Sequence, residues 1–100
     1  MNRGDVYEIA QLHIRPDARE EFERAVPGAL EVLAAAPGCR GAQVLFGIEQ
    51  PDEPCLAVHW DSVEAHEDFR AAPLFAEYRA TIAETFAAPP TYRHFTVGPR

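Results

Sequence analysis

The chain has 100 residues, of which 47% are hydrophobic and 25% are charged. This composition is typical of one small globular domain and not of a disordered segment, so we expect a single domain over residues 1–100. Acidic residues outnumber basic ones by 16 to 9, and the formal net charge is −7. Because such a surface repels phosphate groups, neither nucleic acid nor an anionic membrane is expected as a partner.

The sequence contains no targeting or disulfide signal. No apolar run approaches the ~20 residues that cross a bilayer, and residues 1–5 do not resemble a signal sequence, which predicts a cytoplasmic protein. Cys39 and Cys55 are expected at opposite ends of one hairpin, farther apart than the ~4–7 Å between Cα atoms that a disulfide needs. No Cys or His spacing is typical of a metal site, so none is predicted.

The first third of the chain predicts a strand and a helix. Residues 6–14 alternate, and both faces of the strand carry apolar groups, so we expect it to be covered on both sides. Asp17 is the predicted N-cap of the following helix, with Glu20 completing a capping box. Pro27 lies inside the helical pattern and predicts a kink or break. Gly38 suits a left-handed C-cap.

A hairpin, two helices and a last strand follow. Residues 41–49 and 55–61 are predicted strands joined by a charged turn. Ser62 suits the N-cap of a short helix over residues 63–71, and Pro73 suits the first position of the next helix. The apolar stripe of that second helix consists of Phe75, Tyr78, Ile82 and Phe86. Residues 91–97 form the last predicted strand.

This order, β-α-β-β-α-α-β, fits a ferredoxin-like split-βαβ α+β fold. A four-stranded antiparallel sheet would carry its helices on one face and leave the other face bare. Because several strands have apolar residues on both faces, the bare face cannot be wholly polar. Burying ~600 Å² of it against a second copy would contribute about 15 kcal/mol before entropic costs. The sequence therefore predicts a homodimer.

Three short segments occur in an order that suggests a family: Ala-Pro-Gly-Cys at 36–39, His-Trp-Asp-Ser-Val-Glu-Ala-His at 59–66, and Phe-Arg-Ala-Ala-Pro-Leu-Phe at 69–75. Together they resemble the antibiotic biosynthesis monooxygenase (ABM) domain family over about residues 6–97. The resemblance implies a dimeric α+β barrel with a pocket between sheet and helices in each subunit. Some members of that family oxygenate aromatic polyketides or quinols with O₂ and no metal or flavin. Others degrade heme or isomerise small sugars.

The resemblance argues against the heme-degrading branch. Phe69 stands where those proteins have a Trp, and Arg79 stands where they have the iron-binding His. Their first-strand Asn position falls near Ile9. Without that His, the chain lacks an axial iron ligand of this kind.

Candidate catalytic residues are those that can move or hold a proton. His66 or His94 is the predicted proton acceptor, since an imidazole titrates near neutral pH. The Tyr78 hydroxyl could orient a substrate oxygen. The alternatives are a solvated His66 paired with the acidic residues around it, a His94 that serves the core or an interface, and a Tyr78 that is only a core aromatic.

Candidate substrate-binding residues are aromatic or cationic. Trp60, Phe69 and Phe75 are predicted to line the pocket, and Arg79 could bind an anionic substrate group. The alternatives are a Trp60 that anchors the core and an Arg79 that forms a surface ion pair with Glu77 or Glu84.

The hypothesis that combines these features is a cofactor-independent monooxygenase acting on a small phenolic or quinol-like molecule. It requires no cofactor or metal, and its partners are a second copy of the chain and a small hydrophobic or aromatic ligand. One alternative is a non-catalytic dimer of the same fold that binds a small ligand or acts in stress response. Another is an isomerase or lyase that uses a His as base without O₂.

Overall fold

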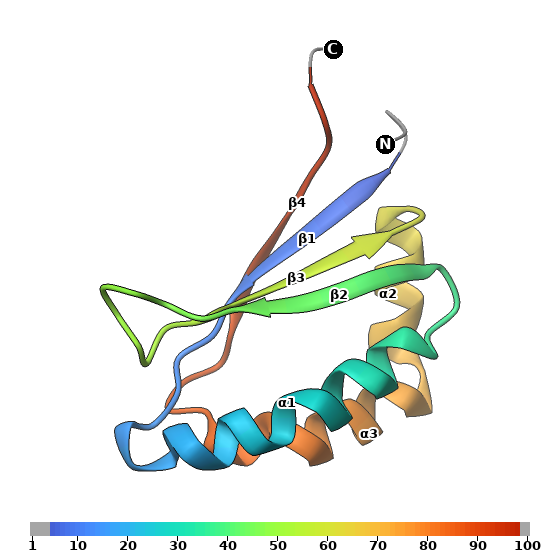
Figure 1. Ribbon diagram of the computed structural model, residues 1–100. Helices are drawn as coiled ribbons and strands as arrows, with labels where there is room; N and C mark the ends of the chain where they lie inside the picture. The colour runs from blue at the N-terminus through green and yellow to red at the C-terminus, as the bar shows by residue number, and fades with distance from the viewer. Residues whose placement is uncertain (1–4, 99–100) are drawn as a thin grey trace.

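The computed structural model describes residues 5–98 as one four-stranded antiparallel sheet with helices on one side (Figure 1). The sheet has the order β2-β3-β1-β4, which confirms the predicted ferredoxin-like α+β fold. In chain order the elements are β1 (Val6–Gln11), η1 (Pro16–Ala18), α1 (Arg19–Ala34), β2 (Cys39–Leu45), β3 (Cys55–Trp60), α2 (Val63–Ala71), α3 (Pro73–Ile82), η2 (Ala83–Thr85) and β4 (Thr91–Phe95).

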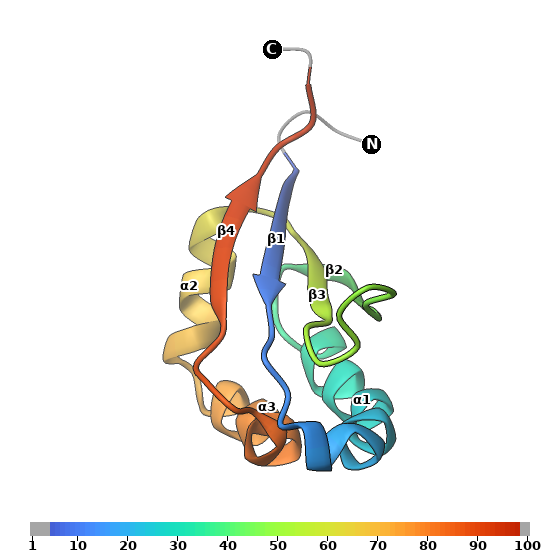
Figure 2. The same cartoon turned by 90° about the vertical axis from the view of Figure 1, so that its left-hand side faces the viewer.

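The central strand β1 determines which side chains meet beneath the sheet. It pairs with β3 on one side and β4 on the other, so Glu8 lies opposite both Val58 and His94. The pairing of β1 with β4 is visible in Figure 2. Because side chains alternate along a strand, Glu8 and Ala10 face the helices while Tyr7 and Ile9 face away from them.

Helix α1 begins without the predicted cap. Asp17 lies in η1 and pairs with Arg15 at 3.7 Å, while Ala18 precedes the helix with no side-chain cap. The predicted capping box is therefore wrong. The single turn of η1 occupies the residues that the box would need.

Pro27 does not break α1, which is one helix from Arg19 to Ala34. Its ring is exposed, whereas Val26 and Ala29 on either side are buried against the rest of the fold. Packing on both sides of the proline holds the two halves in one helix and offsets the lost hydrogen bond.

All four strands are shorter than predicted. β2 covers Cys39–Leu45 and not residues 41–49, and β3 ends at Trp60 and not at residue 61. β1 ends at Gln11, although Ile14 still forms an isolated bridge with Phe86. β4 ends at Phe95 and not at residue 97. Gly38 has the predicted left-handed conformation with φ of 84°, and a Cβ there would lie 2.7 Å from the Cβ of Ala65.

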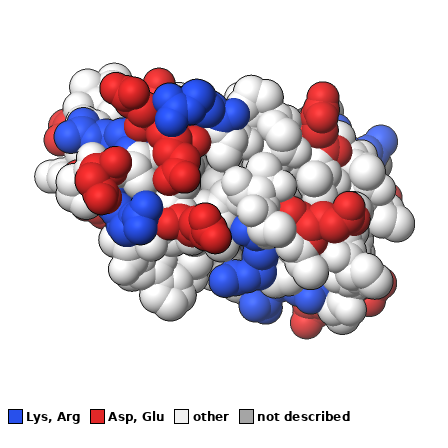
Figure 3. All heavy atoms as spheres, turned by 90° about the horizontal axis from the view of Figure 1, so that it is seen from below, with Lys and Arg blue, Asp and Glu red and all other residues white. Residues whose placement is uncertain are grey.

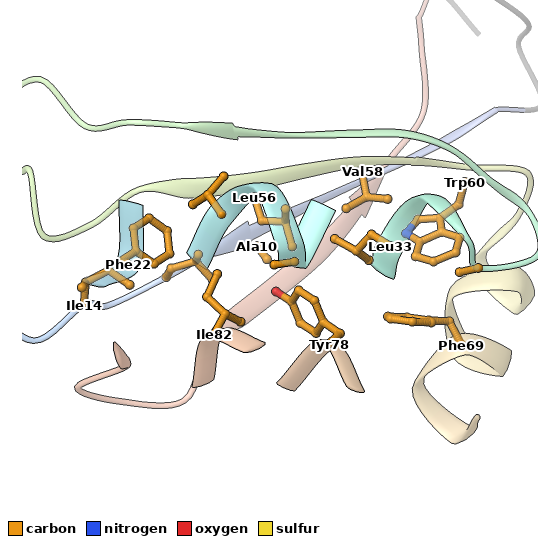
Figure 4. Packing of buried hydrophobic residues seen from close by; sticks show 14 of the residues in the cluster. Ala10, Ile14, Phe22, Leu33, Leu56, Val58, Trp60, Phe69, Tyr78 and Ile82 are labelled. Carbon is orange, nitrogen blue, oxygen red and sulfur yellow. The ribbon is translucent and has the colours of Figure 1, made fainter. Parts of the chain in front are cut away.

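The core lies between the sheet and the helices and is continuous from Phe22 to Trp60 (Figure 4). Its buried members come from all three helices, from β1 and β3, and from the segments that follow or precede them, such as Leu12, Ile14 and Ala36. The other sheet face is mixed and includes Leu45 and Phe95, which are 48% and 45% exposed. Both cysteines are free, and within residues 5–98 no helix is long and apolar enough to cross a membrane.

We expect Ser62→Ala to lower the free energy of unfolding by about 1 kcal/mol, because the Ser62 hydroxyl accepts a hydrogen bond from the Ala65 amide at 3.0 Å. Ser62→Asp keeps an accepting oxygen and should retain most of the stability. Urea unfolding of the three proteins checks this, and equal losses in both variants would contradict it.

Candidate functional site

A cavity of about 90 Å³ lies between the sheet and the helices. One water needs only about 10–15 Å³, so this space accommodates a small molecule. Its wall is mostly aliphatic and aromatic with a few polar groups, and consists of Glu8, Ala10, Leu12, Leu33, Leu56, His66, Phe69, Arg70, Phe75, Tyr78, Arg79, Phe86, Pro90 and Tyr92. We call this space the sheet–helix cavity.

Glu8 places a carboxyl group in the wall of this cavity. The residue is only 6% exposed, and the indole Nε1 of Trp60 donates a hydrogen bond of 3.0 Å to its Oε1. Burial raises the pKa of Glu8, while the Trp60 hydrogen bond and the positive charge of Arg70 oppose the rise. A carboxyl group of raised pKa exchanges protons closer to neutral pH than an exposed one does.

His66 lies against Glu8 and is only 3% exposed. Its Nε2 is 3.3 Å from Glu8 Oε1, and its ring stacks on Trp60 with centroids 5.2 Å apart. Burial, together with the nearby His94 and Arg70, lowers the pKa of His66 to about 4. The imidazole is therefore neutral at pH 7, with one ring nitrogen free to accept a proton.

His94 extends this contact away from the cavity. Its Nε2 lies 2.8 Å from Nδ1 of His66, because β4 pairs with β1 and brings His94 opposite Glu8. His94 is partly exposed and does not line the cavity. Glu8, His66 and His94 thus form a connected series from the cavity toward the surface, which we call the carboxyl–histidine chain.

The carboxyl–histidine chain can carry a proton in either direction. In the tautomer in which Nδ1 of His66 donates to His94, a proton accepted by Glu8 can pass to Nε2 of His66 while the Nδ1 proton of His66 passes to Nε2 of His94. His94 then releases its own Nδ1 proton. The 3.3 Å step between Glu8 and His66 is slightly longer than an ordinary hydrogen bond, as is common in sites without substrate.

Tyr78 adds a hydroxyl group to the opposite wall. Its side chain rises from α3 toward the sheet, with the oxygen directed toward Ala10 (Figure 4). Burial raises the pKa of Tyr78, and the nearby Glu8 adds to the rise, so the hydroxyl stays protonated. Among residues 5–98 it has no hydrogen-bond partner. It can therefore donate to an oxygen of a bound molecule.

Two arginines flank the cavity near Phe75. The guanidinium carbons of Arg70 and Arg79 lie 5.8 Å and 5.9 Å from the centre of that ring, within the range of cation–π attraction. Arg70 also donates a hydrogen bond to the Tyr92 hydroxyl. These contacts hold positive charge in the cavity wall.

The structure separates the predicted site residues into two groups. His66, Phe69, Phe75, Tyr78 and Arg79 all line the cavity, whereas Trp60 and His94 do not. Trp60 is fully buried and acts on the site through its hydrogen bond to Glu8, so its predicted place in the pocket lining is wrong.

The structure also contradicts two of the alternative roles given above for site residues. His66 is not a solvated histidine paired with its acidic neighbours, because α2 turns it inward on the same side as Phe69. Arg79 forms no ion pair with Glu77 or Glu84, nor with any other carboxylate in the described residues.

Sequence reasoning missed Glu8, Arg70 and Tyr92. A signal for Glu8 was present, since it is the one charged residue on a strand face that otherwise holds apolar side chains such as Ala10 and Leu12. No comparable signal marks Tyr92, whose place depends on the pairing of β4 with β1. Among residues 5–98, no three His, Cys, Asp or Glu side chains gather in a way that could hold a metal ion.

Comparison with known proteins points to one family. The family model "Antibiotic biosynthesis monooxygenase" matches residues 5–81. The chain is 30% identical to the uncharacterised protein YczJ of Bacillus subtilis (strain 168) over 91 residues, which cover 90% of this chain and 96% of YczJ.

Two solved structures share the fold. A candidate antibiotic biosynthesis monooxygenase from Bordetella bronchiseptica is 34% identical with a TM-score of 0.91, covering 96% of this chain and 99% of that one. A mutant form of SnoaB from Streptomyces nogalater, described as a cofactor-independent oxygenase, is 16% identical with a TM-score of 0.79, covering 97% and 96%. At that identity the likeness to SnoaB concerns the fold alone.

The lowered pKa of His66 predicts a pH dependence of stability. Between pH 6.5 and about 4 the unfolded chain binds a proton at this residue that the folded chain does not, so stability falls as the pH falls through this window. The raised pKa of Glu8 has the opposite effect on stability. Its contribution to the free energy of unfolding is lost as the pH rises through the pKa that Glu8 has in the folded chain. In His66→Leu the contribution of His66 to this pH dependence is absent.

Urea unfolding at several pH values between about 7 and 4.5 measures the difference. The wild-type protein should lose stability relative to His66→Leu as the pH falls. Because the slopes are compared and not the absolute stabilities, a weaker variant still provides the test. Parallel curves would show that His66 titrates alike in the folded and unfolded chains.

Proposed function

Because the chain belongs to the antibiotic biosynthesis monooxygenase family, we propose that it is a cofactor-independent monooxygenase acting on a small phenolic or quinol-like ring. The observation that carries the proposal is the pairing of Glu8 with a neutral, buried His66 in a largely apolar cavity. A non-catalytic ligand-binding protein has no need of a buried proton acceptor. The cavity of about 90 Å³ favours one ring over a fused polycyclic substrate.

The proposed reaction begins with removal of the substrate's hydroxyl proton by Glu8, assisted by His66. The resulting phenolate transfers one electron to O₂, and the two radicals combine into a carbon–peroxide bond at a ring carbon that carries hydrogen. Loss of water from this peroxide leaves a carbonyl group. One oxygen atom enters the product and the other leaves as water with the two hydrogens that the substrate has lost.

The other residues of the cavity support these steps. Tyr78 donates a hydrogen bond to the oxygen on which negative charge develops, since its hydroxyl is protonated and without a partner in the described residues. Phe69 and Phe75 provide ring contacts and exclude water from the reactive intermediates. His94 takes up the abstracted proton and returns it through His66 and Glu8 when the peroxide loses water.

We further propose that the protein is a homodimer in the cytoplasm. Ile9, Leu45 and Phe95 belong to the sheet face that no helix covers, and a second copy would remove them from water. The two free cysteines fit a reducing compartment.

The proposed activity predicts O₂ consumption by purified, metal-free protein with electron-rich single-ring phenols and hydroquinones. With ¹⁸O₂, one labelled atom should enter the product, as mass spectrometry would measure. Glu8→Gln should lower the rate by about 100-fold or more, which is the usual scale of a lost general base. His94→Gln should lower it by at least about tenfold.

His13→Gln is the matched control, because His13 lies beyond β1 near Glu53 and outside the cavity. Its rate should equal that of the wild-type protein. Turnover that continues unchanged without O₂ would replace the monooxygenase by an isomerase or lyase. Absence of any product above the autoxidation background across the panel would contradict the proposal.

The proposed dimer predicts a particle of twice the 11.1 kDa chain mass in sedimentation at micromolar concentration. Replacing Ile9 by Arg places a charge on the uncovered face and should shift the population to monomer. A wild-type protein that stays monomeric at high concentration would refute this arrangement.

A further inference from the structure

We infer that the substrate is an anion, a single hydroxylated ring carrying a carboxylate, and that Arg70 and Arg79 hold this carboxylate at the wall of the sheet–helix cavity. The inference rests on the proposed function and narrows its substrate class. It depends on where the arginines lie and on which of them have acidic partners.

The pairing of arginines in this acidic chain is uneven. Among residues 5–98, four arginines have a side-chain nitrogen within 4 Å of a carboxylate oxygen, at distances from 2.8 to 3.8 Å. They are Arg15, Arg19, Arg24 and Arg40. Acidic and basic groups accordingly alternate over much of the helical face (Figure 3). Arg70, Arg79 and Arg93 have no carboxylate partner within residues 5–98. Arg93 lies 5.5 Å from the centre of the Phe95 ring and does not line the cavity, whereas Arg70 and Arg79 do.

Arg70 and Arg79 are directed toward the cavity by aromatic contacts. Arg70 lies 5.0 Å from the centre of the Tyr92 ring and donates to its hydroxyl, and both guanidinium groups lie within 6 Å of the Phe75 ring. A guanidinium group offers five N–H donors in a planar fork that suits a carboxylate. The contacts with Tyr92 and Phe75 use only part of this capacity, so each arginine keeps donors for a ligand.

The charge distribution within the cavity defines one orientation for such a ligand. Glu8 repels a carboxylate from its own position beside His66, while Arg70 and Arg79 attract it to the part of the wall beside Phe75. The hydroxyl group of the ring can then reach Glu8 and Tyr78. With a volume of about 90 Å³ there is room for one ring between them. The reacting ring carbon needs only a hydrogen, so the carboxylate takes no part in the oxidation.

The test is binding without O₂, measured by calorimetry under argon near neutral pH. The probes are 3-hydroxybenzoate and 3-hydroxybenzamide, which match in size and hydroxyl position and differ in charge. The wild-type protein should bind the benzoate at least about tenfold more tightly than the amide. Arg70→Gln and Arg79→Gln should each remove most of this preference, while Arg70→Lys and Arg79→Lys should keep part of it.

Arg24→Gln is the control, because it removes the same charge from an exposed site on α1 outside the cavity. It should leave both affinities unchanged. Equal affinity for the two probes, no binding of either, or a preference that survives in Arg70→Gln and Arg79→Gln would overturn the inference. Because no turnover occurs under argon, an anion preference without later O₂ uptake would contradict the monooxygenase alone.

Discussion

The carboxyl group of Glu8 beneath the sheet is the constraint on which the rest of the site depends. An acidic group in an apolar interior is costly unless partners compensate it. Trp60 donates one hydrogen bond to it, and His66 supplies a ring nitrogen at 3.3 Å. The same burial that makes the group costly also raises the pKa of Glu8 and lowers that of His66, which removes the ordinary preference of the proton for the imidazole. This is the condition under which a carboxyl group and an imidazole can share a proton.

The fold brings these partners together from distant parts of the chain. Because β1 is an interior strand, its neighbours β3 and β4 supply Trp60 and His94 on either side of Glu8. Helix α2 supplies His66 from below, and its start is fixed by the Ser62 cap. The antiparallel order β2-β3-β1-β4 places the strands that carry Trp60 and His94 on either side of the strand that carries Glu8. The site therefore follows from the topology and not from any local motif.

This origin explains which features can be predicted from the sequence. The element order, the Ser62 cap, the Gly38 conformation and the aromatic stripe around Tyr78 are local patterns, and they predict the correct fold and part of the cavity lining. The contact of His66 with His94 joins residues 28 positions apart in sequence and depends on strand pairing, which alternation alone does not reveal. Of the kink or break predicted at Pro27, the break does not occur, because tertiary packing outweighs a local helix penalty.

Glu8 is absent from the site residues predicted from the sequence, although it lies at the centre of the site. A single acidic residue on an apolar strand face has two interpretations. Either that part of the face is exposed to water, or the carboxyl group is buried and hydrogen-bonded to partners. The sequence alone does not distinguish these two interpretations, because it does not show that Trp60 and His66 lie next to Glu8. The acidic residues around His66 in the sequence likewise favour a solvated side chain, yet helical spacing places it on the inner side with Phe69. In both cases the decisive information is three-dimensional.

The most direct test of the central claim is ¹⁵N NMR of the histidine rings at neutral pH. A continuous carboxyl–histidine chain predicts that His66 is neutral with one protonated nitrogen. It also predicts a scalar coupling through the hydrogen bond between Nδ1 of His66 and Nε2 of His94. A doubly protonated His66 at neutral pH, or two rings with no coupling between those nitrogens, would contradict the account.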